Sequence, residues 1–481
     1  MKVQESSPAY EALTQSVSTD NWTLVSLKDL GKWSGGGTPS KSKLDYWEGG
    51  TIPWVSPKDM KTDHIVDSED HITQAAIDES TAKLIPAGSV LIVTRSGILS
   101  HTLPVAVTTV PVTINQDLKA LTPREGVLPE YVAWALRCFA REILNTCSKQ
   151  GTTVSSIETA ALNRFEIPVA PLDQQKRTVA EIEKQFSRLD EAVANLKRVK
   201  TNLKRYKAAV LKAAVEGRLV ETEAERARRE GRSFETGAQL LQRILETRRS
   251  QWQGKGKYKE PAAPDITDLP ELPEGWVWAS PDQLAESADN SICAGPFGTI
   301  FKAKDFRPSG IPIIFLRHVA PGRYLNHKPG FMDVSKWQEL FQSYSVYGGE
   351  LLITKLGEPP GVCAIYPEGV GPAMVTPDVI KLSVNADVVL PRYLMHYFNS
   401  EAARRFSTGV AFGTTRLRLT IPIFRGMPVP LPSFKEQQDI VTEIDRSFSL
   451  SDKAEAQVNA NLQRAERLRS AVLNKSFTIG V

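Results

Sequence analysis

Two long stretches of the chain carry apolar residues at alternating steps of three and four. One runs from Asp173 to Gly217, and the other from Ser433 to Phe477. Such a stripe predicts a coiled-coil helix, because its apolar seam needs a second helix to cover it. The predicted seam residues are Val179, Ile182, Phe186, Leu189, Val193, Leu196, Leu203 and Val210 in the first helix, and Val441, Ile444, Phe448, Val458, Leu462 and Val472 in the second. At 1.5 Å per residue the first helix would be roughly 65 Å long.

Local signals mark the ends of these helices. Asp173, close behind Pro171, is predicted as the N-cap of the first helix, and Gly217 as the residue that stops it. The segment from Ser433 to Glu436 has the spacing of a capping box and is predicted to open the second helix.

The two helices belong to a longer internal repeat. Tyr131 corresponds to Tyr393 and Gln175 to Gln437, at a common offset of 262 positions. The same offset relates the sequences at residues 151–153 to those at 413–415, and those at 209–211 to those at 471–473. The chain is therefore a tandem duplication in which a globular segment precedes each long helix.

The globular segments mix short apolar strands with a helix in each copy, which predicts an α+β protein. Strands are expected at 51–55, 89–94, 104–107, 313–316 and 351–354, and helices at 129–144 and 391–406. The predicted divisions are an arm at 1–21, a globule at 22–171, a long helix at 172–217, a charged helical extension and linker at 218–273, a second globule at 274–432 and a second long helix at 433–481. Two antiparallel long helices would place the globules in a pseudo-two-fold arrangement around an intramolecular coiled coil.

Composition adds little to this outline. The formal net charge is only +4, although basic residues outnumber acidic ones by more than two to one between Lys197 and Lys259, which favours a polyanionic partner. No apolar run approaches 18 residues, and the four cysteines lack a CxxC spacing. We therefore expect a cytoplasmic protein with reduced thiols and no membrane span.

Motifs for catalysis and metal binding are missing from the sequence. The glycine-rich loops have neither the P-loop spacing nor the dinucleotide-binding spacing, and the six histidines are scattered. Residues 377–381 lack the acid–lysine pair of a nuclease and are predicted as a turn and strand. The sequence predicts no catalytic residue, no metal site and no cofactor held by this chain.

The remaining motifs resemble those of the specificity subunit of Type I restriction–modification systems. The segments at 36–40, 46–47, 52–55 and 58–60 are similar to one form of target-recognition domain, and the segment from Gly295 to Phe306 is similar to another. Residues 428–441 resemble the junction with the conserved coiled coil. One departure is Gln174, which stands where the family pattern has an acid like Glu436.

The resemblance implies two α/β target-recognition domains separated by the coiled coil. Each would bind one half of a split sequence in double-stranded DNA, and the helices would set the length of the spacer. Two methyltransferase subunits would dock on this chain and flip adenines for methylation with S-adenosylmethionine. Restriction and translocase subunits would supply the ATP- and Mg-dependent steps, so these cofactors belong to the partners. The bases read and the spacer length do not follow from one sequence.

Candidate DNA contacts lie in polar or basic loops of both globules. They are Thr38, Ser40, Lys41, Lys43, Arg95, Lys149, Gln150, Thr152 and Thr153 in the first, and Lys302, Lys304, Arg317, Lys355, Thr414, Thr415, Arg416 and Arg418 in the second. For each of these residues, an exposed loop position without a DNA contact is an open alternative. The glycines at 36, 37, 295 and 298 are interpreted as turn formers, and Trp47, Trp54 and Trp276 as core residues.

Two other functions compete with DNA recognition. A coiled-coil scaffold would hold protein partners without touching DNA, but the basic linker and the basic loops disfavour it. A self-sufficient DNA enzyme is disfavoured by the missing catalytic motifs.

Overall fold

A computed structural model describes residues 21–149, 154–253, 257–296, 301–302, 305–410 and 417–478. The chain divides into two compact units. The first unit comprises residues 1–197 together with 459–481, and the second comprises residues 198–458. The predicted arm at 1–21 lies almost entirely outside the described residues.

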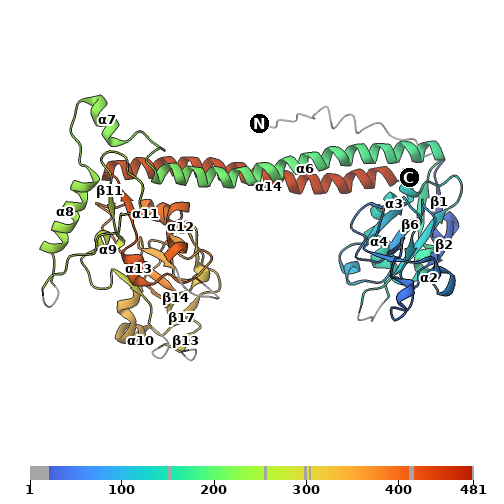
Figure 1. The fold of residues 1–481 in the computed structure, drawn as a ribbon, viewed down its shortest axis with the longest axis horizontal. Coiled ribbons are helices and arrows are strands. Elements are labelled where there is room, and N and C mark those ends of the chain that lie inside the picture. The colour runs from blue at the N-terminus through green and yellow to red at the C-terminus, as the bar shows by residue number, and fades with distance from the viewer. Residues whose placement is uncertain are drawn as a thin grey trace. The chain divides into compact units, whose positions relative to one another are not determined.

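The first unit is built on a five-stranded sheet and a three-stranded sheet (Figure 1). The order of the larger sheet is β2-β9-β6-β7-β4, and that of the smaller is β5-β3-β8. The strands are β1 (Thr23–Ser26), β2 (Gly31–Gly35), β3 (Ile52–Val55), β4 (His64–Ile65), β5 (Asp70–Ile72), β6 (Val90–Val93), β7 (Val105–Thr108), β8 (Thr113–Ile114), β9 (Leu118–Pro123) and β10 (Glu166–Val169), and the α-helices before α6 are α2 (Gln74–Glu79), α3 (Pro129–Cys138), α4 (Ala140–Cys147) and α5 (Thr159–Arg164). The predicted strands in this unit are confirmed within one or two residues.

The second unit repeats this plan with additions. Its sheets have the orders β12-β22-β19-β20 and β13-β17-β14-β21-β18. The strands are β11 (Val277–Ala279), β12 (Ile292–Ala294), β13 (Phe306–Arg307), β14 (Ile311–Ile314), β15 (Val319–Ala320), β16 (Arg323–Tyr324), β17 (Gly330–Met332), β18 (Ser345–Val346), β19 (Leu351–Thr354), β20 (Cys363–Ile365), β21 (Ala373–Val375), β22 (Val379–Leu382) and β23 (Val429–Leu431). The helices are α7 (Glu223–Glu230), α8 (Gly237–Ser250), α9 (Pro281–Leu284), α10 (Val334–Lys336), α11 (Pro391–Phe398), α12 (Glu401–Val410) and α13 (Ile421–Arg425).

Strand pairing shows that the duplication reaches the topology of the globules. In the first unit β3 pairs antiparallel with β5 and parallel with β8. In the second unit β14 pairs antiparallel with β17 and parallel with β21. The central pairs β6·β9 and β19·β22 are also both antiparallel. The two globules therefore share one fold although their sequences have diverged.

Three predicted boundaries are wrong. The helix expected at 129–144 is divided at Phe139, which is non-helical and packs against Phe165. The helix expected at 391–406 is divided because the Asn399 side chain exchanges hydrogen bonds with the backbone of Cys363. The strand expected at 313–316 ends at residue 314, where the His318 ring accepts a hydrogen bond from the amide of Phe315 and a turn begins.

Each globule is closed by its own first and last strands. β1 pairs antiparallel with β10, and β11 pairs antiparallel with β23. A buried glutamine then anchors the start of each long helix: Gln175 accepts a 2.9 Å hydrogen bond from the amide of Leu128, and Gln437 accepts one of 2.9 Å from Leu390. These equivalent bonds explain why the glutamine is kept in both copies of the repeat.

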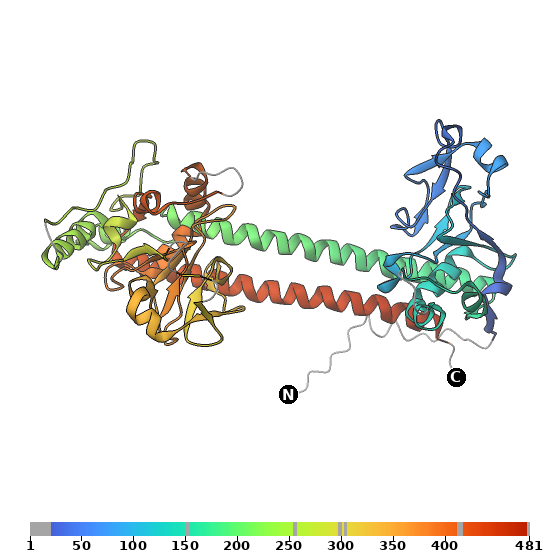
Figure 2. The same ribbon diagram turned by 90° about the horizontal axis from the view of Figure 1, so that it is seen from below.

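The long helices are continuous over 44 residues each, α6 (Leu172–Val215) and α14 (Phe434–Phe477). Within each unit a segment of one helix lies antiparallel beside a segment of the other (Figures 1 and 2). In the first unit Arg469 bonds Asp190 and its guanidinium lies 4.5 Å from the ring centre of Phe186. In the second unit the hydroxyl of Tyr206 donates to that of Ser447.

The predicted seam residues all lie inward on these helices. Those fully buried are Val179, Ile182, Phe186, Val210, Val441, Ile444 and Val458. Those half-buried are Leu189, Val193, Leu196, Leu203, Phe448, Leu462 and Val472. At the outer ends of the helices the seam merges with the globular cores: Val472 packs with the first core and Val210 with the second.

The helix ends correct one prediction and confirm another. Asp173 is not the N-cap, because α6 already begins at Leu172 and the Pro171 carbonyl accepts the first hydrogen bonds. Gly217 does stop the helix: its φ is +66°, and the next amide, Arg218, donates to the carbonyl of Ala213. At α14 the Ser433 hydroxyl accepts from the amide of Glu436, which is one half of the predicted capping box; the Glu436 carboxylate accepts from Trp276 and from the amide of Glu223.

The charged extension after α6 is helical and packs on the second unit. α7 and α8 both open with complete capping boxes, at Thr222 and Thr236. Leu240 and Ile244 enter the second core, while Arg226 pairs with Asp439. Among the helices of the described residues, none is both long enough and apolar enough to cross a lipid bilayer.

Candidate nucleic-acid interface

In the first unit, a polar turn between β8 and β9 collects two of the predicted residues. The Thr38 hydroxyl bonds the side chain of Gln116. The Arg95 guanidinium pairs with the Asp117 carboxylate at 2.6 Å, and the amide of Arg95 donates to the Asp117 carbonyl. Arg95 nevertheless keeps 56% of its side chain exposed. The turn therefore holds a cation at the surface in a fixed orientation.

Gly36, two residues before Thr38, is required by close packing rather than by its backbone angles. A Cβ atom on Gly36 would lie 1.9 Å from the carbonyl oxygen of Asn115. Gly36 is therefore a point of close backbone approach, which brings the loop carrying Thr38 against the turn. Lys149 reaches the same region, since its amide donates to the carbonyl of Ser156 and Ser156 forms a bridge with Arg95.

Ser40, Lys41 and Lys43 lie on a separate exposed loop. Lys43 is ion-paired with Glu79 at 2.6 Å and bonded to the hydroxyl of Tyr46, and the Glu79 bond raises the pKa of Lys43. The Ser40 hydroxyl bonds that of Ser42. Lys41 is exposed. Lys43 is thus held by Glu79 and Tyr46 rather than by the turn at Asp117.

The second unit repeats the polar turn at the equivalent place, between β21 and β22. The amide of Lys355 donates to the carbonyl of Asp378, as that of Thr94 does to Asp117. Arg418 lies with its guanidinium 3.8 Å from the Asp378 carboxylate and forms a bridge with Leu356. A Cβ atom on Gly295 would lie 1.9 Å from the carbonyl of Val375, which repeats the close approach made by Gly36.

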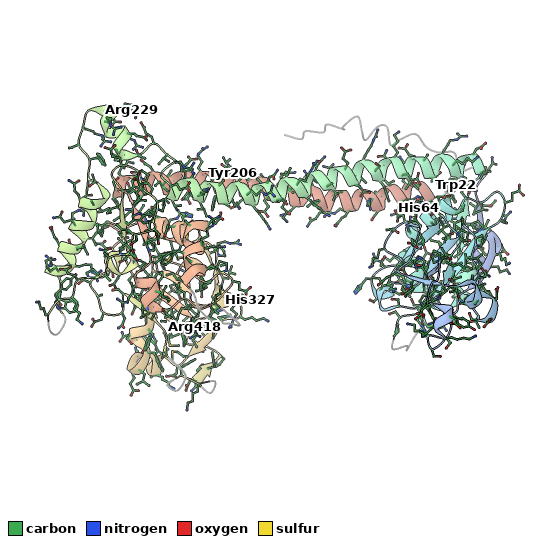
Figure 3. All side chains as sticks on the ribbon, in the orientation of Figure 1. Trp22, His64, Tyr206, Arg229, His327 and Arg418 are labelled. Carbon is green, nitrogen blue, oxygen red and sulfur yellow. The ribbon has the colours of Figure 1, made fainter. Side chains whose placement is uncertain are left out.

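Lys355 occupies the position of Thr94 in the first unit, and it is buried. Only 4% of its surface is exposed, and burial lowers its pKa, with a further lowering by Arg418 and an opposing effect of Asp378. Arg418 is about half exposed and lies at the surface of the second unit (Figure 3). Of these two cations, Arg418 is therefore the one exposed to solvent, while Lys355 is buried and bonds the turn through its amide.

The other two described candidates of the second unit flank the same turn. Lys302 and Arg317 line an open hollow of about 520 Å³, together with Phe301, Phe306, Phe315, Leu316, Thr376, Pro377 and Asp378. Arg317 lies 4.1 Å from the ring centre of Phe315 and donates to the carbonyl of Lys328. Lys302, Arg317, Lys355 and Arg418 thus surround one turn.

Seven predicted residues lie outside the described part of the chain. They are Gln150, Thr152, Thr153, Lys304, Thr414, Thr415 and Arg416. Of the three tryptophans interpreted as core residues, Trp54 and Trp276 are buried, and Trp47 is half-buried and packs against Trp54.

Sequence reasoning missed the acidic half of each turn. Asp117 was not singled out, and Asp378 was interpreted only as part of a turn. The internal repeat could have indicated both acids. Asp117 lies between β8 and β9, Asp378 lies between the equivalent strands β21 and β22, and the two are 261 positions apart, close to the 262 positions that separate the long helices. Among the described residues, no group of three or more His, Cys, Asp or Glu side chains could hold a metal ion.

Comparison with known proteins finds similar sequences among DNA specificity subunits. Residues 19–205 match the model of the Type I restriction modification DNA specificity domain. The chain is 46% identical over 158 residues to the Type I restriction enzyme EcoR124I/EcoR124II specificity subunit of Escherichia coli, and 32% identical over 160 residues to the MjaIX specificity subunit of Methanocaldococcus jannaschii. These alignments cover 33% and 32% of this chain, and 39% and 36% of the two relatives.

Solved structures share the fold over nearly the whole chain. A chain from a study of complex assembly and conformational transition of the type I R-M system matches with a TM-score of 0.64, over 95% of this chain and 97% of that one, at 16% identity. The HsdS subunit from Thermoanaerobacter tengcongensis matches with a TM-score of 0.55 over 96% and 98%, also at 16% identity. Residues 19–205 are thus similar to the Type I restriction modification DNA specificity domain, and the chain shares the fold of these solved structures.

Proposed function

We propose that this chain is the non-catalytic DNA-recognition subunit of a Type I restriction–modification complex, and that each unit reads one half of a two-part target. The observation that carries the proposal is the repeated polar turn. Asp117 and Asp378 occupy equivalent places on the same fold, and each is paired with an arginine, which is Arg95 in the first unit and Arg418, at the position of Ser156, in the second. A duplicated recognition surface suits a target with two half-sites.

The residues around each turn divide into two chemical roles. Exposed cations such as Arg317 and Lys149 neutralise backbone phosphates, which positions the protein and gives affinity that depends on salt. The bonded pair Arg95–Asp117 and the looser pair Arg418–Asp378 are assigned to the edges of bases, since a carboxylate accepts from amino groups and a guanidinium donates to guanine. Positions held by Asp117 and Asp378 are therefore assigned to base reading.

Partner subunits supply the chemistry in this proposal. Two methyltransferase subunits dock on the chain and methylate an adenine in each half-site with S-adenosylmethionine, and restriction and translocase subunits use ATP and Mg. The long helices α6 and α14 set the spacer between the two halves. The relationship to the specificity subunits supports these assignments, and no group in the described residues is needed to hold either cofactor.

A coiled-coil scaffold without DNA binding is the second candidate, favoured only by the length of the two helices. Titration of the purified chain with double-stranded DNA at several salt concentrations separates the two functions. A recognition subunit gives a steep negative slope of log affinity against log salt, because bound phosphates release counterions. A scaffold gives a slope near zero. Cleavage or methylation by the chain alone would contradict the non-catalytic assignment.

A further inference from the structure

Three phenylalanine rings border the hollow beside Asp378 in the second unit. Phe306 is 42% exposed, and Phe301 and Phe315 are half-buried. Phe301 and Phe315 pack against the small core that contains Phe341, whereas the exposed ring of Phe306 beside Lys302 and Arg317 is not accounted for by that core. Phosphate contacts do not use it either, so a surface that binds DNA only through its backbone would leave this ring without a role.

The packing of the rings determines which part of a ligand they can contact. Phe306 and Phe315 are stacked, with ring centres 6.0 Å apart and an angle of 16° between the rings. Arg317 covers Phe315 at 4.1 Å, and Phe301 meets Phe306 edge to face with centres 5.2 Å apart. A Cβ atom on Gly330 would lie within 3.2 Å of both stacked rings, so the backbone of Gly330 closes one side.

The faces of these rings are therefore largely covered by one another, by Arg317 and by Gly330. The part of the rings that lines the hollow is apolar, but no open ring face is left on which a base could stack. A flat base inserted between the rings would have to displace Arg317 or Phe301. A small apolar group needs no such rearrangement. In the major groove of DNA, the one apolar group that a base presents is the 5-methyl group of thymine.

We propose that this hollow reads the 5-methyl group of a thymine in the half-site of the second unit. The inference rests on the proposed function and adds a base class to it. Lys302, Arg317 and Arg418 around the rings provide the positive charge that brings the DNA backbone to this surface. Asp378, on the same border, accepts a hydrogen bond from the amino group of an adjacent base pair.

The first unit has a polar residue at the position of Phe315, which makes the proposal specific to one half-site. β3 corresponds to β14, and the residue after β3 is Ser56 where the residue after β14 is Phe315. The Ser56 hydroxyl and amide both bond the carboxylate of Asp59. The equivalent position is thus polar and already satisfied in the first unit.

Replacement of single thymines by uracil tests the proposal, because uracil lacks only the methyl group. The full chain is titrated with duplexes that carry its two-part target, with one thymine replaced at a time. Loss of one buried methyl group is expected to weaken binding about three- to fourfold at one position, and that position lies in the half read by the second unit. Phe306→Ala is expected to abolish the difference between thymine and uracil there, whereas Phe306→Leu keeps most of it.

The outcomes separate this inference from the proposed function. Sequence-specific binding that is indifferent to every thymine-to-uracil replacement in the second half would overturn the thymine contact and leave DNA recognition intact. A difference confined to the first half, or one that persists in a folded Phe306→Ala variant, would also overturn it. Absence of specific binding to the intact target would instead count against the proposed function. Binding of the unsubstituted chain to the uracil-containing duplexes tests the proposal even if the Phe306→Ala variant does not fold.

Discussion

The indole nitrogen of Trp276 donates a 2.9 Å hydrogen bond to the carboxylate of Glu436 at the start of α14. In the first unit the indole of Trp22 makes the equivalent bond, of 2.7 Å, to the amide oxygen of Gln174. The two units therefore make the same contact with acceptors of different chemistry. A neutral amide holds the first globule to its helix, and an ionisable acid holds the second.

This difference predicts that the contact makes the free energy of unfolding depend on pH in the second unit and not in the first. Burial raises the pKa of Glu436 to about 7 from an ordinary value of 4.5, and the nearby Glu223 raises it further while Trp276 and the amide of Glu223 oppose the rise. The native carboxyl then keeps a proton that the unfolded chain has lost, so the free energy of unfolding falls as pH rises from about 4.5 to about 7. The fall is about 3 kcal/mol at most.

Glu436→Gln is expected to remove this fall, because glutamine accepts the indole bond without titrating. Hydrogen exchange of the core amides in the second unit, measured between pH 5 and pH 8, reports the change. Gln174→Glu is the matched variant and is expected to introduce a weaker fall into the first unit, where Gln174 is only half-buried. Equal pH dependence in the chain with and without Glu436→Gln would show that the carboxyl is not the cause.

The buried glutamines are predicted to be major stabilising residues of each unit. Gln175 accepts from the amide of Leu128 and donates to the carbonyls of Ala170 and Gly126. Gln175→Ala leaves these buried groups unpaired and is expected to lower the free energy of unfolding by about 2–3 kcal/mol. Gln185→Ala, on the exposed face of α6, is the control, with an expected change within about 0.5 kcal/mol in chemical denaturation.

Arg317 is predicted to contact a backbone phosphate. Arg317→Gln is expected to weaken DNA binding roughly tenfold near 0.1 M salt and to reduce the magnitude of the salt slope by about one, across different sequences. Arg229→Gln, on α7 and paired with Glu221, carries the same charge change away from the proposed surface and is expected to have no such effect. A loss of affinity that depends on sequence would assign Arg317 to base reading instead.

The two acidic turns are predicted to act on separate halves of the target. Asp117→Asn weakens the pairing that orients Arg95 and is expected to relax the sequence preference of one half-site, with Asp378→Asn relaxing the other. Selection of bound fragments from randomised DNA measures both preferences at once. If either substitution alters both half-sites, the assignment of one half to each unit is wrong.

The long helices are predicted to set the spacer. Removal of seven residues from each, between Phe186 and Val210 in α6 and between Phe448 and Val472 in α14, shortens the helices by about 10 Å, which is roughly three base pairs of DNA. The half-sites themselves should be unchanged and the spacer shorter. An unchanged spacer in a folded variant would show that something other than these helices measures the distance.

The sequence predicted the parts of the fold whose pattern is long and periodic. Forty-four-residue helices leave an unmistakable apolar stripe, and Gly217 has the backbone angle that its residue type favours. The boundaries it missed depend on tertiary contacts. Phe139 interrupts a helix to pack against Phe165, and Asn399 interrupts another to bind the backbone of β20. Neither contact leaves a local signal.

The candidate site was harder to predict because charge alone does not show which residues meet. Lys43 and Arg95 are both exposed loop cations in sequence, but one pairs with Glu79 and the other joins the turn at Asp117. Lys355 looks equally available, yet folding buries it under Arg418. Asp117 and Asp378 lie in turns that are separated in sequence from the arginines they meet, so only the folded topology brings each acid to its arginine.

The most direct test of the central claim is to map methylated adenines in DNA from cells that express this chain with its methyltransferase subunits. The account predicts one motif of two short halves around a fixed spacer, and predicts that exchange of residues 22–171 for those of a relative changes only one half. A single uninterrupted motif, or a change of both halves on that exchange, would contradict it.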